Sequence, residues 1–189
     1  IEHDRNEVFR LKPHENQNVN KWWLCDEGRL TYRMMNERKT RISRPLGRVE
    51  GNLEGVSWEE AYGAIVKRVK ELKPFPHEVL ALTDTRASNE ELFLLQKLLK
   101  EGFSSDNIFC PLPKWGQSES DFFINTLITT DKTSNRAGAL ALKINGDEKN
   151  AKLKKVIEGE LKVVFILGNP FEAESEIKEI IKRTQLVVH

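Results

Sequence analysis

Cysteine is scarce in this sequence, which has only Cys25 and Cys110 among its 189 residues. Two thiols so far apart along the chain do not make a disulfide framework, so we expect a reducing compartment. Long apolar runs are also missing, because no stretch approaches the ~18 apolar residues of a membrane-spanning helix. The four histidines share no metal-ligand spacing. These shortages exclude a disulfide-stapled domain and a histidine-ligated metal site, and the sequence encodes no transmembrane helix.

An excess of one charge is missing too, since 30 Lys and Arg oppose 29 Asp and Glu and leave a net charge of +1. Without a basic excess there is no electrostatic reason to expect a nucleic-acid partner. No P-loop, G-x-S-x-G or HExxH motif occurs, and no carboxylate pair is placed for acid–base work. Hydrolase and nucleotide-hydrolysing activities therefore have no residues to support them. What is present, 39% hydrophobic and 31% charged residues, is typical of a folded globular chain.

The second part of the chain, from about residue 50, contains two strong helix signals. Ser57 with Glu60, and Ser88 with Glu91, form capping boxes, in which a serine and a glutamate three residues later satisfy early backbone amides. Apolar residues recur at helical spacing after each box, and Gly102 stands where the C-terminal cap of the second helix belongs. We therefore predict a helix that begins at each box.

Short apolar runs between the helical segments indicate buried strands. The expected strands are Val79–Leu82, Asn107–Phe109, Val163–Leu167 and Leu186–Val188. The remaining expected elements are helices over residues 118–128, 151–158 and 172–183, and a loop over residues 129–139. Strands that alternate with helices of about 12 residues favour a parallel sheet with right-handed crossovers. The predicted fold class is therefore α/β.

The first part of the chain, residues 1–49, has a different composition. Glu7–Leu11 is typical of a strand, and six arginines fall between Arg29 and Arg48 with few apolar residues among them. Such a segment does not bury enough apolar surface to fold alone and needs a neighbour, a metal or a partner chain. We therefore predict two domains, a small β-rich one over residues 1–49 and an α/β one over residues 50–189.

Cys25 is the first residue that suggests chemistry. It lies on a polar, glycine-containing stretch beside Trp22 and Trp23, in the segment that is poor in apolar residues. A free cysteine is most often a small buried hydrophobe, and an iron–sulfur cluster needs about four ligands, usually cysteines. The residues alone therefore leave open whether Cys25 is a structural thiol or one cluster ligand.

Segments spread over most of the chain resemble a known family. The segments near the front are Glu7–Pro13, Val19–Asn20, Trp23–Asp26, Gly28–Leu30 and Tyr32. The later ones are Arg44–Leu46, Gly51, Val56–Ala61, Asn135–Ala139 and Leu167–Pro170. Together they resemble the large peripheral-arm iron–sulfur subunit of bacterial respiratory NADH–quinone oxidoreductase (complex I), in the molybdopterin oxidoreductase superfamily. The front segments are the most specific of these.

The resemblance implies a [4Fe–4S] cluster with Cys25 as its fourth ligand. The family places three cluster cysteines just before the position of Ile1, so we expect the other ligands upstream of the present chain. Arg29 and Arg33 are candidates to favour the thiolate, and a solvated face or a subunit contact is an equally good interpretation of them. The resemblance assigns no catalytic residue.

The same resemblance argues against molybdenum. Superfamily members that work at a pterin-bound metal commonly carry a lysine shortly after the fourth cysteine, where this chain has Asp26–Gly28. Cys110 lacks the setting of a metal ligand, and we interpret it as a buried structural thiol. The turn Gly168–Pro170 lies near the nucleotide part of the cofactor in pterin-binding relatives. Its glycine and proline are equally explained as a turn and the opening of a helix.

The leading hypothesis is therefore an electron-transfer and scaffold subunit of a respiratory NADH dehydrogenase. Its partners would be the other subunits of the hydrophilic arm, at the cytoplasmic side of the inner membrane and without direct membrane insertion. The alternatives are a molybdopterin-dependent oxidoreductase such as a formate dehydrogenase, and a non-redox assembly scaffold that has lost the cluster. Residues 50–189 would form a Rossmann-like domain of the molybdopterin oxidoreductase type. We expect both domains to be incomplete, the first at its N-terminus and the second at its C-terminus, since Leu186–Val188 would otherwise leave a bare apolar edge.

Overall fold

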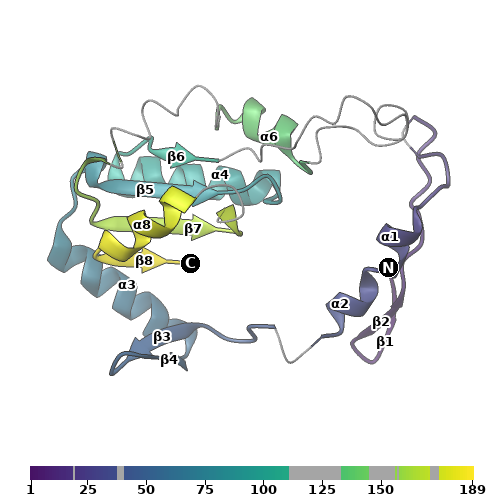
Figure 1. Ribbon diagram of the computed structural model, residues 1–189, viewed down its shortest axis with the longest axis horizontal. Coiled ribbons are helices and arrows are strands. Elements are labelled where there is room, and N and C mark those ends of the chain that lie inside the picture. The colour runs from purple at the N-terminus through teal and green to yellow at the C-terminus, as the bar shows by residue number, and fades with distance from the viewer. Residues whose placement is uncertain (19, 38–40, 111–132, 145–155, 157, 171–174) are drawn as a thin grey trace. The chain divides into compact units, whose positions relative to one another are not determined.

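The computed structural model divides into two units, Ile1–Ala61 and Tyr62–His189. It describes residues 1–18, 20–37, 41–110, 133–144, 156, 158–170 and 175–189 (Figure 1). The boundary between the units falls inside one helix, α3 (Trp58–Leu72). The helix expected over residues 118–128 lies outside the described residues, as does most of the one expected over 151–158.

Within the described residues, the first unit contains two short hairpins and two short helices before α3 begins. Its elements are β1 (Glu2–Asp4), β2 (Glu7–Arg10), α1 (Asp26–Leu30), α2 (Tyr32–Met35), β3 (Leu46–Val49) and β4 (Asn52–Gly55). Strands β1 and β2 are antiparallel, and so are β3 and β4. The β3–β4 turn has Glu50 at φ 49° and Gly51 at φ 92°. Two successive positive φ angles are typical of the two-residue turn that matches strand twist.

Polar contacts, not a hydrophobic core, hold β2 to α2 within this unit. Asn36 follows α2, and its side-chain Oδ1 accepts a hydrogen bond of 3.0 Å from the Val8 amide. Its Nδ2 donates to the Val8 carbonyl at 2.7 Å. Among the described residues, no buried hydrophobic side chain occurs before Val79. The scarcity of apolar residues in the first part of the sequence therefore has its counterpart in the structure.

Four parallel strands form the sheet of the second unit (Figure 1). They are β5 (Val79–Thr83), β6 (Ile108–Phe109), β7 (Val163–Leu167) and β8 (Leu186–Val188). Their order across the sheet is β6-β5-β7-β8, and each neighbouring pair is parallel. All five residues of β5 are buried, as in a strand that is covered on both faces. The predicted parallel α/β arrangement is confirmed.

Both predicted capping boxes are present at the starts of α3 and α4 (Asn89–Lys97). The Ser57 hydroxyl accepts from the Glu60 amide at 3.2 Å, and the Glu60 carboxylate accepts from the Ser57 amide at 2.8 Å. The same pair of bonds joins Ser88 and Glu91. These bonds satisfy amides that the first helical turn leaves without partners.

Helices pack on both faces of the sheet and bury alternate strand residues. Val79 packs with Leu92 of α4 in one apolar cluster. The next residue, Leu80, packs with Ile177 of α8 (Ser175–Arg183) in the other cluster. Figure 1 shows α4 and α8 on opposite sides of the strands. This unit is therefore a helix–sheet–helix sandwich whose core follows the two-residue period of the strands.

Two expectations about local structure are wrong. Gly102 does not form a left-handed C-terminal cap, because a π-helical turn (Leu98–Gly102) extends α4 and the left-handed residue is Ser104, at φ 51°. Residues 136–139 do not form a loop, because they belong to α6 (Arg136–Ala141). The Asn135 side chain initiates that helix by accepting from the Gly138 amide at 3.2 Å.

A buried ion pair joins the segments that lead into β5 and β7. Glu78 accepts a hydrogen bond of 2.7 Å from the Phe75 amide and lies 3.0 Å from the Lys162 ammonium. The Phe75 hydrogen bond, helped by Lys162, holds the pKa of Glu78 below its ordinary value despite the opposing effect of burial. This carboxylate therefore links the amino ends of the two central strands in its ionised form.

We expect Glu78→Gln to weaken the dependence of stability on acidic pH. Because folding lowers the pKa of Glu78, the ionised group stabilises the fold above the unfolded-state pKa, and this contribution is lost as the pH falls through the folded-state value. Urea unfolding between about pH 7 and pH 3 measures the effect. The exposed Glu160→Gln is the control for removing one acidic group. If the free energy of unfolding of Glu78→Gln fell with pH as steeply as that of the wild type, the ionised Glu78 would not stabilise the fold as described.

Candidate functional site

Cys25 lies at the start of α1 with its side chain exposed. Its backbone is extended, at φ −67° and ψ 156°, and its Sγ accepts a hydrogen bond of 3.3 Å from the Gly28 amide. A Cβ at Gly28 would lie 3.4 Å from that sulfur, so glycine leaves the thiol uncovered on this side. The structure thus presents an accessible sulfur that is oriented by one backbone amide.

The surroundings of Cys25 supply apolar surface and charge, but no further sulfur ligand among the described residues. Trp22 and Trp23 are 71% and 64% exposed, so neither belongs to a core of this chain. The Arg29 guanidinium lies near the Asp26 carboxylate, at 3.9 Å, and Arg33 lies in the last turn of α2. Within the described part of the chain, no group of three or more His, Cys, Asp or Glu side chains is arranged to hold a metal.

Cys110 has the opposite character. It follows β6, is 1% exposed and packs in the same apolar cluster as Val79 and Leu92. Burial, with a smaller effect of the Asp84 charge, raises the pKa of the Cys110 thiol to about 11. Burial in an apolar cluster therefore disfavours the thiolate that metal ligation requires. The expected burial of Cys110 is confirmed.

A second constellation of polar groups lies at the carboxyl ends of β5 and β7, in the second unit. Asp84 follows β5 directly, is 8% exposed, and its Oδ2 accepts from the Asn169 amide at 2.7 Å. Arg86 donates to the same oxygen from Nη2 at 3.0 Å, and its backbone amide donates to Oδ1 at 2.8 Å. Arg86 also donates to the Asn169 carbonyl at 3.2 Å. The two strand ends are thus joined through one carboxylate and one guanidinium.

The charge state of Asp84 follows from these contacts. Burial by itself raises the pKa of this carboxyl group, but the hydrogen bonds from Asn169 and Arg86 outweigh burial and hold the pKa below its ordinary value. Asp84 is therefore ionised at neutral pH and is neutralised locally by Arg86.

The sequence pattern pointed to the turn at Gly168–Pro170 but not to Asp84 or Arg86. The feature of the sequence that could have indicated Asp84 and Arg86 is their position directly after a buried strand. Charged residues at that position lie at the edge of a parallel sheet where ligands usually bind. The partner of Asp84 stands 85 residues later in the chain, and no local pattern reveals that pairing.

We expect Gly168→Ala to lower the free energy of unfolding by about 1–3 kcal/mol. Gly168 has φ +81°, and an added Cβ would lie 2.8 Å from Asp84 Oδ2. The matched control is Gly63→Ala inside α3, where an added Cβ meets nothing within 4 Å. In this control the free energy of unfolding should rise by about 0.5–1 kcal/mol, because alanine stabilises a helix more than glycine does. Chemical unfolding measures both, and equal effects would contradict the described turn.

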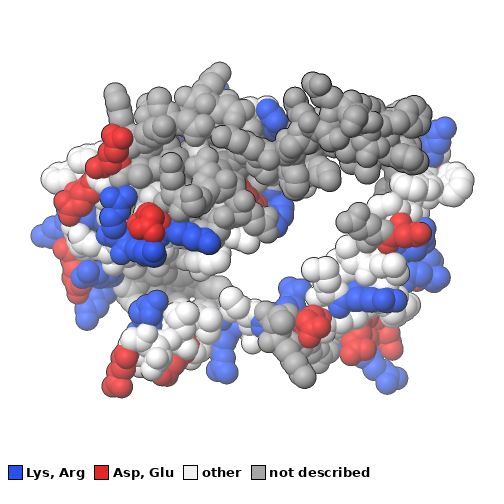
Figure 2. All heavy atoms as spheres, in the orientation of Figure 1, with Lys and Arg blue, Asp and Glu red and all other residues white. Residues whose placement is uncertain are grey.

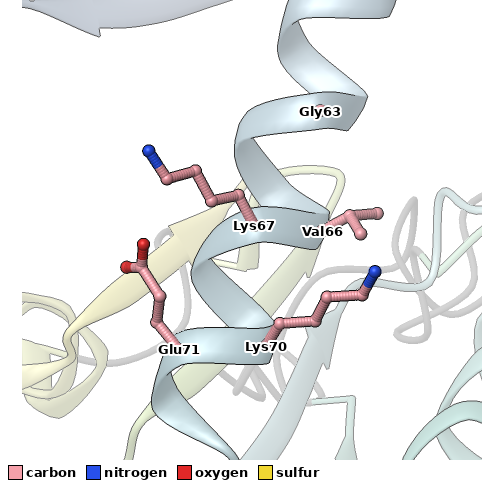
Figure 3. A pocket seen from close by; sticks show the side chains of 5 residues that line it. All are labelled: Gly63, Val66, Lys67, Lys70 and Glu71. Atoms are coloured by element: carbon pink, nitrogen blue, oxygen red, sulfur yellow. The ribbon is translucent and has the colours of Figure 1, made fainter.

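Two hollows of the surface lie away from both constellations. One, of about 460 Å³, is lined by Gly63, Val66, Lys67, Lys70 and Glu71. All of these belong to α3, with Lys67 and Glu71 on one side of the helix and Val66 and Lys70 on the other (Figure 3). The other hollow, of about 330 Å³, is lined by residues 158–161, Ile180 and Arg183. A hollow along a single helix does not enclose a ligand, and neither hollow contains a group from the two constellations.

The face shown in Figure 2 carries charges of both signs. On the face shown in Figure 2, neither unit gathers Lys and Arg, or Asp and Glu, into a large patch of one sign. This distribution agrees with the net charge of +1. Among the described residues, none of the helices is long and apolar enough to cross a membrane.

Comparisons with known proteins match part of the chain. Residues 41–111 match the profile of the molybdopterin oxidoreductase family. The chain is 35% identical over 95 residues to a subunit of the NADH-quinone oxidoreductase of Rickettsia bellii, and 32% identical over 101 residues to the same subunit of Rickettsia prowazekii. It is also 30% identical over 114 residues to a protein of Staphylococcus haemolyticus that is assigned by name as a formate dehydrogenase.

These matches differ in how much of each protein they cover. They extend over 50%, 53% and 57% of this chain but over only 13%, 14% and 12% of the three relatives, respectively. The chain therefore corresponds to a small part of much longer proteins. The resemblance inferred from the sequence is confirmed.

Proposed function

We propose that this chain, whose residues 41–111 match the molybdopterin oxidoreductase family, is part of an electron-transfer and scaffold subunit of a respiratory NADH dehydrogenase. Similarity to one subunit of the NADH-quinone oxidoreductase in two Rickettsia species supports this proposal. The observation that carries it is the contrast between the two thiols. Cys25 is exposed, whereas Cys110 is buried in an apolar cluster that disfavours its thiolate, so Cys25 is the accessible thiol of the two.

The proposed role of Cys25 is to donate one thiolate to a [4Fe–4S] cluster. The described residues fit one ligand of such a group and not the full set. The family resemblance, and not the structure, is the basis for proposing the remaining ligands upstream of Ile1. A bound [4Fe–4S] cluster supplies one-electron transfer. The Gly28 amide orients the sulfur, and an N–H···S hydrogen bond is one of the contacts through which a protein sets a cluster potential. Neither residue makes or breaks a bond to a substrate.

In this proposal the chain has two domains, an iron–sulfur segment over residues 1–49 and a Rossmann-like α/β domain of the molybdopterin oxidoreductase type over residues 50–189. The parallel sheet of the second unit supports the second assignment. Among the described strands, the first of the sheet lies between the second and the third, which is the flavodoxin-like variant of the doubly wound order.

The proposed partners are the other subunits of the hydrophilic arm, on the cytoplasmic side of the inner membrane. Exposed large apolar side chains near Cys25 support a subunit contact there, since they have no core to enter. They are Trp22, Trp23, Leu30 and Met34. Aromatic residues and methionine are enriched in the cores of protein interfaces. The mixed surface charge and the absence of a basic excess give no support to a nucleic-acid partner.

A molybdopterin-dependent oxidoreductase such as a formate dehydrogenase is the second candidate, favoured by the similarity to the Staphylococcus haemolyticus protein. The described residues do not fit its metal centre. Cys110 is a protonated, buried thiol, and the Asn169 amide at the strand end already donates to Asp84. A non-redox scaffold is the third candidate, which differs from the first only in the cluster.

Metal analysis of the intact protein tests the proposed function. We expect iron and acid-labile sulfide, and no molybdenum or tungsten, because Cys25 is the proposed cluster ligand and the buried Cys110 is a poor candidate for a pterin-metal ligand. Plasma mass spectrometry after anaerobic purification measures all three metals. Stoichiometric molybdenum or tungsten would favour the oxidoreductase, and iron-free protein after reconstitution with iron and sulfide would favour the scaffold.

A further inference from the structure

The carboxyl ends of β5 and β7 form the position at which open parallel sheets usually bind ligands. The chain runs from β5 to β6 on one side and then crosses to β7 on the other side of β5. The crevice between two strands whose connections leave in opposite directions is the usual ligand site of this architecture. Asp84 follows β5 and Gly168 follows β7, so both residues lie at this position.

The donors that would hold an anionic ligand at this position are already occupied from within the chain. The Asn169 amide donates to Asp84 Oδ2 at 2.7 Å, and the Arg86 guanidinium donates to the same oxygen at 3.0 Å. A backbone amide after a strand and a nearby guanidinium are the groups that hold phosphate oxygens in nucleotide sites. Here a carboxylate of the protein takes the place of the phosphate.

The space beside the turn is occupied as well. Gly168 has φ +81°, and an added Cβ would lie 2.8 Å from Asp84 Oδ2 and 3.0 Å from its Cγ. The Asp84 carboxylate therefore lies against the backbone of the turn, where glycine otherwise allows a ligand to approach closely. The residue is only 8% exposed.

The contacts of Asp84 exceed those of an ordinary local turn. A turn-forming aspartate needs only the bond from the amide two residues on, which Arg86 provides at 2.8 Å to Oδ1. The second oxygen accepts a bond from the Asn169 amide of the β7 turn, 85 residues away, and another from the Arg86 guanidinium two residues on. The bond to Asn169 joins the carboxyl ends of β5 and β7 and is not required by the local turn.

We propose that Asp84 is a built-in anion that occupies the phosphate position of the β5–β7 crevice and prevents this chain from binding a nucleotide pyrophosphate there. Removing the carboxylate takes away the acceptor that the Asn169 amide and the Arg86 guanidinium share, so that a phosphate-type anion can take its place. The inference uses the proposed function only for the kind of ligand that is excluded. Its test measures anion binding and involves no iron, so each of the two proposals can fail while the other stands.

Isothermal titration calorimetry with inorganic pyrophosphate tests this proposal on the whole chain. We expect no saturable binding to the wild type and saturable binding to Asp84→Ala. The double variant Asp84→Ala/Arg86→Ala is the matched control, because it opens the same space without the guanidinium. It should bind pyrophosphate at least about tenfold more weakly than Asp84→Ala, as expected for the loss of a charge-assisted bond.

Two results would overturn the proposal. One is wild-type binding of pyrophosphate as tight as that of Asp84→Ala, which would show that the carboxylate does not block the site. The other is a folded Asp84→Ala that binds no more tightly than the double variant. If circular dichroism shows that Asp84→Ala does not fold, Asp84→Ser, which also removes the carboxylate and most of the side-chain volume, replaces it in the same comparison.

Discussion

Replacing Leu92 by alanine is expected to lower the free energy of unfolding by about 2–5 kcal/mol. Leu92 is fully buried, at 0% exposure, and packs between α4 and the sheet in the cluster that contains Val79. Alanine would remove three methyl or methylene-sized groups and leave a cavity that rigid strand neighbours fill only in part. A loss of this size is a large fraction of the total stability of a domain, about 5–15 kcal/mol.

The matched control lies two residues farther along the same helix. Leu94 is 61% exposed, so Leu94→Ala should change the stability by no more than about 0.5 kcal/mol. Urea unfolding followed by circular dichroism compares the same Leu→Ala change at a buried and at an exposed position of one helix. Equal losses in both variants would show that the sheet does not pack against α4 as described.

The strands and the capped helices were predictable because each depends on residues that are close in sequence. The run Val163–Leu167 is apolar throughout and forms β7 with the predicted bounds. The boxes at Ser57 and Ser88 start their helices because the capping atoms belong to residues three positions apart. Parallel pairing of the strands followed from the alternation of the two patterns.

Features that depend on distant residues or on an unusual helical turn were not predictable. The bond between Asp84 and the Asn169 amide spans 85 residues, and it forms only because β5 and β7 become neighbours. Gly102 was expected as a cap, but a π-helical turn carries the chain past it. The helix α6 was missed because its Asn135 cap is followed by only six helical residues, too few to show a period.

For Cys25, the family resemblance led to the hypothesis of a cluster ligand, and the structure added the exposure and the contacts of its side chain. Residue patterns alone left open a buried structural thiol, which the exposure of Cys25 does not support. The single hydrogen bond from Gly28 and the exposed Trp22 and Trp23 describe a sulfur that is accessible beside an apolar surface. Its role as a ligand remains a proposal.

Replacing Cys25 by alanine in the intact protein is expected to abolish one low-temperature [4Fe–4S] signal in electron paramagnetic resonance. A cluster that loses one of about four thiolate ligands loses iron or is not assembled. The fold should survive, because Cys25 is exposed and contributes no packing to the apolar clusters. Circular dichroism and unfolding in urea verify that survival.

Cys110→Ala is the matched control for the loss of a thiol. Cys110 is buried and protonated at neutral pH, so its removal should leave every cluster signal in place. If Cys110→Ala removed the same signal, the loss would reflect a general perturbation and not ligation by Cys25.

The most direct test of the electron-transfer proposal is therefore the low-temperature spectrum of the dithionite-reduced intact protein with and without the Cys25 sulfur. The proposal predicts that one [4Fe–4S] signal present in the wild type and in Cys110→Ala is missing from Cys25→Ala. A spectrum of Cys25→Ala identical to that of the wild type would contradict it.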